Sequence, residues 1–185
     1  MKLMVGLGNP GRKYTNTRHN AGWLVLAELS RKYGTSSPKE KFYGELVEAL
    51  IDGQQVLLLA PHTFMNRSGQ SVLAARDFYK IPEANLLVIC DDFNLPLSKL
   101  RLRSGGSAGG QNGLEDIIRT LGSDQIHRLR VGIGPVPEQW DPSAFVLGKF
   151  CEDEKKLIEK SVLRAVEGAA HWVTAGIDDS MNQFN

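Results

Sequence analysis

The sequence predicts an α/β protein, a single domain in which a twisted mixed β-sheet with a parallel centre is covered by helices. First, 185 residues, of which 42% are hydrophobic, suit one domain with a sizeable core. Second, short apolar segments typical of buried strands alternate with longer segments of helical period. Third, no repeat, low-complexity segment or linker divides the chain. Residues 1–185 are therefore expected to form this one domain.

Glycine and proline mark the ends of several predicted elements in the first half of the chain. A short apolar run that ends in a glycine- and proline-rich turn predicts a buried strand. The helix after it closes at Gly34. Asp52-Gly53 is a typical hairpin turn. The predicted elements are a strand over 3–7, a helix over about 20–33, hairpin strands over 45–51 and 54–60, and a helix near 69–80.

The same alternation continues in the second half. An apolar strand ends in Asp91-Asp92, a strand with alternating cations follows, and the last helix closes at Gly176. The predicted elements are strands over 86–90, 99–103 and 129–133, helices over about 114–121 and 153–174, and loops over 104–113 and 135–143. This order favours a sheet that is parallel at its centre, with the hairpin on one side.

Composition argues against several classes of protein. The formal charge is +1, so affinity for nucleic acid must come from a local concentration of cations. Cys90 and Cys151 form no C-x-x-C pair, which argues against a disulfide framework and a structural zinc site. No run approaches the roughly eighteen apolar residues of a membrane helix, and the N-terminus does not resemble a signal peptide. We expect a cytoplasmic protein with reduced thiols and no membrane partner.

Cations are concentrated in two segments. In 99–103 they alternate with leucines, and Arg128-Leu129-Arg130-Val131 repeats the pattern. Such alternation is typical of half-buried strands with cations on one face. The two strands either form one basic face that could bind nucleic acid, or are separate solvated faces.

The segment Gly6-Leu7-Gly8-Asn9-Pro10-Gly11 matches the dinucleotide fingerprint G-x-G-x-x-G. That motif needs a helix that begins within it, and an acid about twenty residues later at the end of a second strand. Here residues 12–17 have no helical period, and Glu28 lies inside the predicted helix. The sequence therefore argues against a nucleotide site.

Candidate catalytic residues lie near strand ends. Asn9 and Asp91 follow apolar strands, so they converge with the loop that bears His19 if those strands are parallel neighbours. His19 would then act as a general base, and Asp91 would accept a hydrogen bond from one ring nitrogen. The alternatives are a loop or capping role for His19 and a turn role for Asp91.

The polar segment 63–69 is a candidate for substrate binding. Phe64 and Met65 can form an apolar wall, and the Asn66 carboxamide can pair with a peptide backbone. Alternatively, Asn66 or Ser68 caps the helix that follows.

The glycine-rich loop 104–113 has two weaker interpretations. Residues 105–110 have the glycine spacing of a phosphate-binding loop, but Gln111-Asn112 stand where Lys and Ser or Thr are required. The loop also matches G-x-S-x-G around Ser107, although so many glycines are too loose for a nucleophile elbow. Otherwise it is a mobile loop, or one whose bare backbone admits a ligand beside Asn112.

Together these segments resemble one family, the bacterial peptidyl-tRNA hydrolases. The similarity spans nearly the whole chain in the expected order. The segments that carry it are Gly6–Gly11, Tyr14, Thr17–Gly22, Thr63–Asn66, Ser68-Gly69, Gly105–Gly110, Asn112–Leu114, His127–Gly134 and Val146–Phe150.

The resemblance implies an enzyme that hydrolyses the ester between a peptide, or an N-acyl-amino acid, and the 3′ ribose of tRNA, and so recycles tRNA. It implies no metal and no cofactor. His19 matches the base that activates water, and Asp91 matches the residue that keeps this base competent. Asn9 matches the position linked with telling blocked from free aminoacyl-tRNA.

The resemblance also implies how peptidyl-tRNA binds. Tyr14, Phe64, Asn66 and Asn112 match substrate-contacting positions, with Met65 beside Phe64 in the apolar wall. Arg103 and Arg130 match a pair that grips the 5′ phosphate of tRNA, which favours the single basic face. We expect a monomer with no obligate protein partner.

Three positions depart from the family pattern. Gln111 replaces the histidine that is common in G-G-H-N-G, so an amide that cannot take up a proton stands there. Asn94 stands where an acid is frequent, and Arg103 where a lysine is frequent.

Two alternatives to the esterase stay open at this point. One is a non-catalytic RNA-binding relative of the same fold, similar to splicing partners in plant organelles. The retention of Asn9, His19, Asp91, Asn66 and Asn112 argues against it, as does the lack of a transit peptide. The other is a serine hydrolase that uses Ser107.

Overall fold

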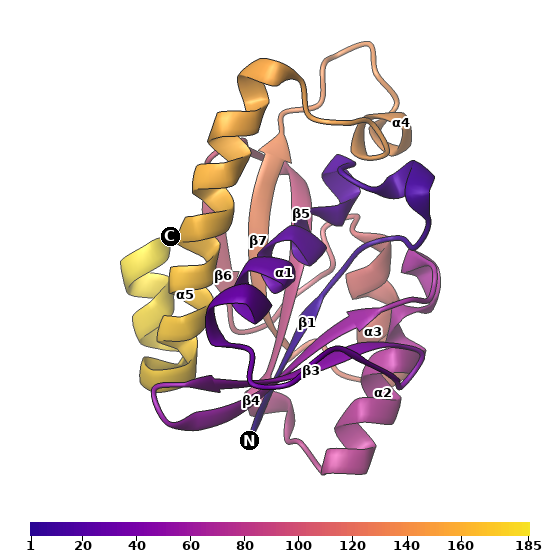
Figure 1. Ribbon diagram of the computed structural model, residues 1–185. Helices are drawn as coiled ribbons and strands as arrows, with labels where there is room; N and C mark the ends of the chain where they lie inside the picture. Colours follow the sequence, from indigo (N-terminus) through magenta and orange to yellow (C-terminus); the bar gives the residue numbers. More distant parts are fainter.

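A seven-stranded mixed sheet runs through the computed structural model, which describes residues 1–185 (Figure 1). The strands are β1 Lys2–Gly6, β2 Lys39–Lys41, β3 Gly44–Ile51, β4 Gln54–Pro61, β5 Leu86–Pro96, β6 Leu100–Arg103 and β7 His127–Gly134. Their order is β2-β3-β4-β1-β5-β7-β6. The central strands β4, β1, β5 and β7 are parallel, whereas β2, β3 and β6 run antiparallel to their neighbours. The predicted mixed sheet with a parallel centre is confirmed.

Helices cover both faces of the sheet, because the central strands are apolar on both sides. The α-helices are α1 Ala21–Tyr33, α2 Ser68–Tyr79, α3 Asn112–Leu121, α4 Pro142–Val146 and α5 Glu152–Phe184, and the short 3₁₀ helices are η1 Arg12–Tyr14, η2 Arg18–Asn20, η3 Met65–Arg67 and η4 Glu83–Asn85. In β1, Met4 packs in the core under α1 and α5, and Leu3 and Val5 pack in the core under α2 and α3. None of the helices combines the length and apolarity needed to cross a bilayer.

The glycines after β1 serve close packing. A Cβ on Gly6 would lie 2.5 Å from the carbonyl oxygen of Gly22 in α1, and a Cβ on Gly8 would lie 2.7 Å from the Trp23 ring. Only glycines therefore let α1 lie this close to β1. As predicted, α1 begins only at Ala21, so no α-helix starts within the G-x-G-x-x-G segment to direct its free N–H groups at a pyrophosphate.

Most helices and strands end close to where the sequence predicted, but two predicted ends are wrong, those of β5 and of the last helix. The hairpin turn forms as predicted, with positive φ at both Asp52 (47°) and Gly53 (78°). However, β5 continues to Pro96, so Asp91 lies within the strand, opposite Val131 of β7. The last helix does not end at Gly176. This residue (φ 83°) kinks α5, and the part of α5 after the kink folds back beside the part before it (Figure 1).

Candidate active site

A cavity of about 370 Å³ lies at the carboxyl ends of the parallel strands, where α/β proteins usually bind ligands. Its walls come from the turn after β1, from η2, η3, β5, the glycine-rich loop, α3 and α4. Eight of the site residues that the sequence predicted line it, namely Asn9, His19, Phe64, Met65, Asn66, Asp91, Asn112 and Arg130. The parallel pairing of β1 with β5 is the reason that these distant segments meet.

His19 and Asp91 form a buried pair in this cavity. His19 Nδ1 lies 2.9 Å from Asp91 Oδ2, and the two side chains are only 9% and 1% exposed. The other ring nitrogen, Nε2, is hydrogen-bonded to no protein group, and His19 lines the cavity. A carboxylate can only accept, so Nδ1 is the donor in this contact, and in a neutral ring Nε2 is then the acceptor nitrogen.

Asn20 holds Asn9 beside this pair. Asn20 Oδ1 accepts the backbone N–H of Asn9 at 2.9 Å, and Asn20 Nδ2 donates to the Asn9 carbonyl at 3.1 Å. Asn9 Oδ1 accepts the backbone N–H of Met65 at 2.9 Å. Since this contact occupies the oxygen of the Asn9 carboxamide, its NH₂ group is left for a ligand in the cavity.

Asn66 and Asn112 present exposed carboxamides from η3 and from the first turn of α3. The capping alternative for 63–69 is wrong: no side chain caps α2, and the Ser68 hydroxyl donates to the Met65 carbonyl at 2.9 Å. Phe64 is 57% exposed and Met65 is buried, so the two present apolar surface at different depths.

Arg18, the neighbour of His19, fastens α4 and the start of α5 to the site. Its guanidinium pairs with Glu154 (Nη2 to Oε2, 2.7 Å) and lies 4.4 Å from the centre of the Phe145 ring. Figure 1 shows α4 next to the indigo segment between β1 and α1, to which Arg18 belongs. Through this attachment, α4 and the residue after it add a wall that the sequence analysis missed, namely Pro142, Ser143, Val146 and Leu147. The only sequence signal for α4 is the Asp141-Pro142 helix start.

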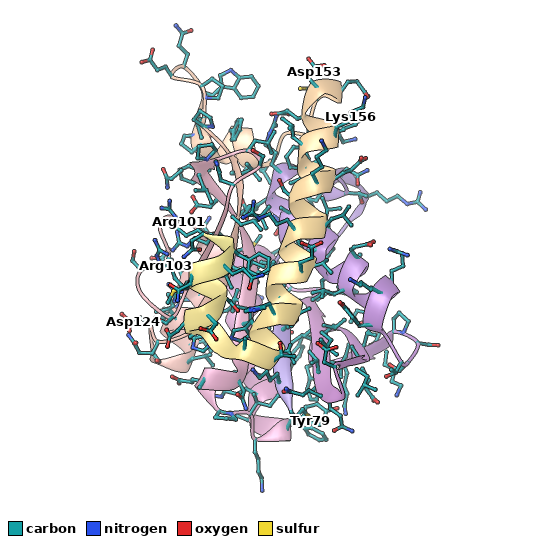
Figure 2. All side chains as sticks on the ribbon, turned by 90° about the vertical axis from the view of Figure 1, so that its left-hand side faces the viewer. Tyr79, Arg101, Arg103, Asp124, Asp153 and Lys156 are labelled. Carbon is teal, nitrogen blue, oxygen red and sulfur yellow. The ribbon has the colours of Figure 1, made fainter.

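A second, polar cavity of about 320 Å³ is lined by arginines of β6 and β7 and is called the arginine-lined cavity below. Arg101, Arg103 and Arg130 line it together with Asp92 and Asn94, and Arg130 belongs to both cavities. Arg130 Nη1 lies 3.2 Å from Asp92 Oδ2. Figure 2 shows Arg101 and Arg103 close together at the sheet edge, beside the last turns of α5. The antiparallel register puts the four arginines of these strands on one face of the sheet, as the single-face alternative predicted.

Arg128 corrects one part of that prediction, because it is fully buried and not exposed on the basic face. Its guanidinium donates to the carbonyls of Ile126 (2.8 Å), Gly106 (2.6 Å), Ser107 (3.2 Å) and Asp124 (3.0 Å). Burial lowers the pKa of Arg128, and the neighbouring Arg130 adds to this effect. Arg128 therefore anchors the glycine-rich loop, a role that alternation of charge could not predict.

Besides Arg103, which lines only the arginine-lined cavity, two candidates from the sequence lie outside the main cavity. Tyr14 does not line it; this half-buried side chain stacks with Lys13 and its carbonyl accepts the Thr17 hydroxyl. Ser107 lines only the arginine-lined cavity, and its hydroxyl makes no hydrogen bond to a base. The serine-nucleophile hypothesis therefore lacks the geometry that it needs.

The remaining reactive groups lie apart from the His19 pair or are inert. Burial, and secondarily the charge of Asp91, raises the pKa of Cys90 to about 12, so this thiol is neutral and not a nucleophile. Glu40, Glu45 and His62 have ligand atoms within 4.8 Å of one another on the β2–β4 side of the sheet, the one group of this kind that could hold a metal ion.

The fold and the site define a class of protein: an α/β protein with a histidine–carboxylate pair and carboxamides in one cavity, adjoining an arginine-lined cavity suited to phosphate. Comparison with known families identifies that class more closely. Residues 3–185 match the sequence model of the peptidyl-tRNA hydrolases, and the chain belongs to this family.

Individual relatives agree over the full length. The chain is similar to the peptidyl-tRNA hydrolase of Rhodopirellula baltica (52% identical, covering 100% of this chain and 97% of the relative). It is also similar to that of Chlorobium phaeobacteroides (48%, covering 100% and 98%). Among solved structures, the crystal structure of peptidyl-tRNA hydrolase from Acinetobacter baumannii superposes with a TM-score of 0.93 at 38% identity, covering 100% of this chain and 94% of that one.

Proposed function

We propose that this protein hydrolyses the ester that joins a peptide, or an N-acyl-amino acid, to the 3′ ribose of tRNA, with His19 as the base that activates water. The product tRNA is thereby returned to use. The observation that carries the proposal is the buried His19–Asp91 pair inside a carboxamide-lined cavity. It is supported by membership of the peptidyl-tRNA hydrolase family over residues 3–185.

The proposed chemistry begins with the free Nε2 of His19, which removes a proton from a water molecule as the water oxygen attacks the ester carbonyl. Asp91 keeps the proton on Nδ1 and stabilises the imidazolium that forms. The tetrahedral intermediate then collapses, the bond to the 3′ oxygen of the ribose breaks, and His19 returns the proton to that oxygen. No covalent acyl-enzyme is needed.

Asn9 is the proposed donor to the oxyanion. Its carboxamide oxygen is held by the Met65 backbone N–H at 2.9 Å, so the NH₂ group is turned toward a bound ligand without a cost in reorganisation. We propose that Asn66 and Asn112 pair with the peptide backbone and that Phe64 and Met65 pack against its side chains. Contact with Tyr14 would involve a part of the substrate that extends beyond the cavity.

Recognition of tRNA is assigned to Arg103 and Arg130, which we propose bind the 5′ phosphate. Both line the arginine-lined cavity, and Arg130 also lines the cavity of the His19 pair, so one substrate can occupy both. Because peptidyl-tRNA is produced by ribosomes, we propose that the enzyme acts in the cytoplasm. We also propose that it is a monomer.

The direct test measures release of labelled N-acetyl-amino acid from N-acetyl-aminoacyl-tRNA, with free aminoacyl-tRNA as the substrate control. His19→Ala should lower kcat by about two to four orders of magnitude, the usual share of a positioned base, with tRNA binding retained. His62→Ala, which removes an exposed histidine outside the cavity, is the matched control and should keep wild-type turnover. A wild-type protein that binds tRNA but releases no acyl group would instead be a non-catalytic RNA-binding relative.

The phosphate contacts are tested by the salt dependence of tRNA binding. Arg103→Gln or Arg130→Gln should each reduce the slope of log Kd against log salt by about one unit. Arg31→Gln removes the same charge from an exposed position on α1, the helix that covers the other face of the sheet, and should leave the slope unchanged. An unaltered slope in Arg103→Gln or Arg130→Gln would remove that residue from the proposed phosphate site.

A further inference from the structure

We propose that Gln111 is a positioning residue for Asp91, locking the carboxylate in the one orientation that serves His19. The inference rests on the proposed function and adds to it a residue that does not touch the reacting atoms. By the resemblance described above, Gln111 stands at a position where a histidine is common, and the structure shows which contacts its amide makes there.

Gln111 is held at both ends of its side-chain amide. It directly precedes α3, is only 6% exposed, and its Oε1 accepts the backbone N–H of Leu114 at 2.8 Å as the helix cap. Its Nε2 donates to Asp91 Oδ1 at 3.0 Å and lies 3.4 Å from Met65 Sδ. A backbone N–H can only donate and a carboxylate can only accept, so one amide orientation alone satisfies both partners.

Asp91 in turn has one donor for each carboxylate oxygen. Oδ2 pairs with His19 Nδ1 at 2.9 Å, and Oδ1 accepts from Gln111 at 3.0 Å. The residue is 2% exposed, so water cannot easily replace a lost donor. Without Gln111 the carboxylate is free to turn about its Cβ–Cγ bond, and a buried oxygen loses its partner. Gln111, which caps α3, thus holds the Asp91 carboxylate in place, and Asp91 in turn keeps the proton of His19 on Nδ1.

The amide is also a donor that carries no titratable proton. The titratable and charged groups around Gln111 are Asp91, which it contacts, His19, which pairs with Asp91, and the Asp92–Arg130 ion pair in the wall of the same cavity. An amide does not titrate near neutrality, so Gln111 offers the same donor to Asp91 at every pH in this range. A histidine at this position would be able to add a second titration.

The test separates the cap from the contact with Asp91. Gln111→Ser keeps a good N-cap but is too short to reach Asp91. It should fold with a lower melting temperature, because the buried Asp91 Oδ1 loses its donor, and it should lower kcat by about ten- to a hundredfold, the value of a hydrogen bond to a charged group, and leave KM within about twofold. The proton NMR signal of the His19 Nδ1–H should shift or broaden in the same variant.

Gln111→Glu is the second variant, because it keeps the length and the capping oxygen but sets a carboxylate against Asp91 Oδ1. Repulsion should lower kcat at neutral pH. As the pH falls, the two acids share a proton, an O–H donor returns, and kcat relative to Gln111→Ser should rise. Gln111→His, which again offers a donor nitrogen, should restore most of the activity and add a second step to the pH profile.

Wild-type kcat and an unchanged His19 signal in Gln111→Ser would overturn the inference, and the proposed function would stand if His19→Ala were inactive. Conversely, an inactive wild-type protein whose His19 signal still responds to Gln111→Ser would refute the proposed function and leave the positioning role intact. Wild-type kcat in Gln111→Ser together with an unchanged pH profile in Gln111→Glu would show that Gln111 serves only as the cap of α3.

Discussion

Replacement of the buried Arg128 is the sharpest test of how the walls of the two cavities are held. Arg128 is fully buried and donates four hydrogen bonds to carbonyls, two of them in the glycine-rich loop, without a carboxylate partner. Each hydrogen bond to a charged donor contributes about 1.5–3 kcal/mol, or roughly 6–12 kcal/mol for the four. Removing the guanidinium from its buried site recovers several kcal/mol of desolvation.

Water can also reach the exposed Ser107 once the guanidinium is gone, whereas the Ile126 carbonyl stays buried. We therefore expect Arg128→Met to lower the free energy of unfolding by about 3 kcal/mol. Because Arg128 orders the loop that lines both cavities, KM for N-acetyl-aminoacyl-tRNA should also rise. Arg128→Lys should recover only part of the loss, since an ammonium cannot span four acceptors.

Urea unfolding followed by tryptophan fluorescence measures this change, and hydrogen exchange at the Gly106 amide, which donates to Asp124, reports the loop itself. Arg101→Met is the matched control, because this arginine is exposed on the neighbouring strand and should change stability by less than about 0.5 kcal/mol. If Arg128→Met cost no more than Arg101→Met, the anchoring role assigned to Arg128 would be refuted.

Three further predictions follow from buried groups. Burial lowers the pKa of His127 below its ordinary 6.5, and Trp172 donates to its neutral Nδ1 at 2.9 Å. The unfolded chain therefore binds this proton more readily, so the stabilisation is fully present above about pH 6.5 and is lost as the pH falls toward the lowered folded pKa. His127→Asn, whose Oδ1 can still accept, should flatten the pH dependence of the free energy of unfolding below neutrality, and an unchanged pH dependence would contradict this. Gly22→Ala should destabilise the fold by about 1–3 kcal/mol, measured by urea unfolding, because the new Cβ would collide with the backbone of Ile89 in β5 and of Leu7 directly after β1. Finally, iodoacetamide near pH 8 should label the exposed Cys151 and spare Cys90, whose pKa is raised to about 12, as mass spectrometry of the native protein would show; equal labelling would refute the assigned burial.

Much of the candidate site could be predicted because its polar residues stand where apolar strands end or become polar, which the sequence shows locally. Asn9 and His19 lie after an apolar run that must end at a glycine- and proline-rich turn, and Asp91 lies at the point where another apolar run becomes polar. Two such runs that are parallel neighbours bring their ends to one sheet edge, whatever the register. The precise contact of 2.9 Å between His19 and Asp91 needed the pairing of β1 with β5 and could not be read from either segment.

What the sequence determined by itself is therefore local: the β-hairpin at Asp52-Gly53, α1, the apolar strands and the residue types at their ends. These follow from backbone preferences and from periodicity, which involve near neighbours in the chain. Only the tertiary structure decided that Arg128 is buried while Arg101 is exposed, that α4 closes the cavity wall, and that Gln111 contacts Asp91. Those outcomes depend on which elements pack against each strand face, and residues far apart in the chain set that packing.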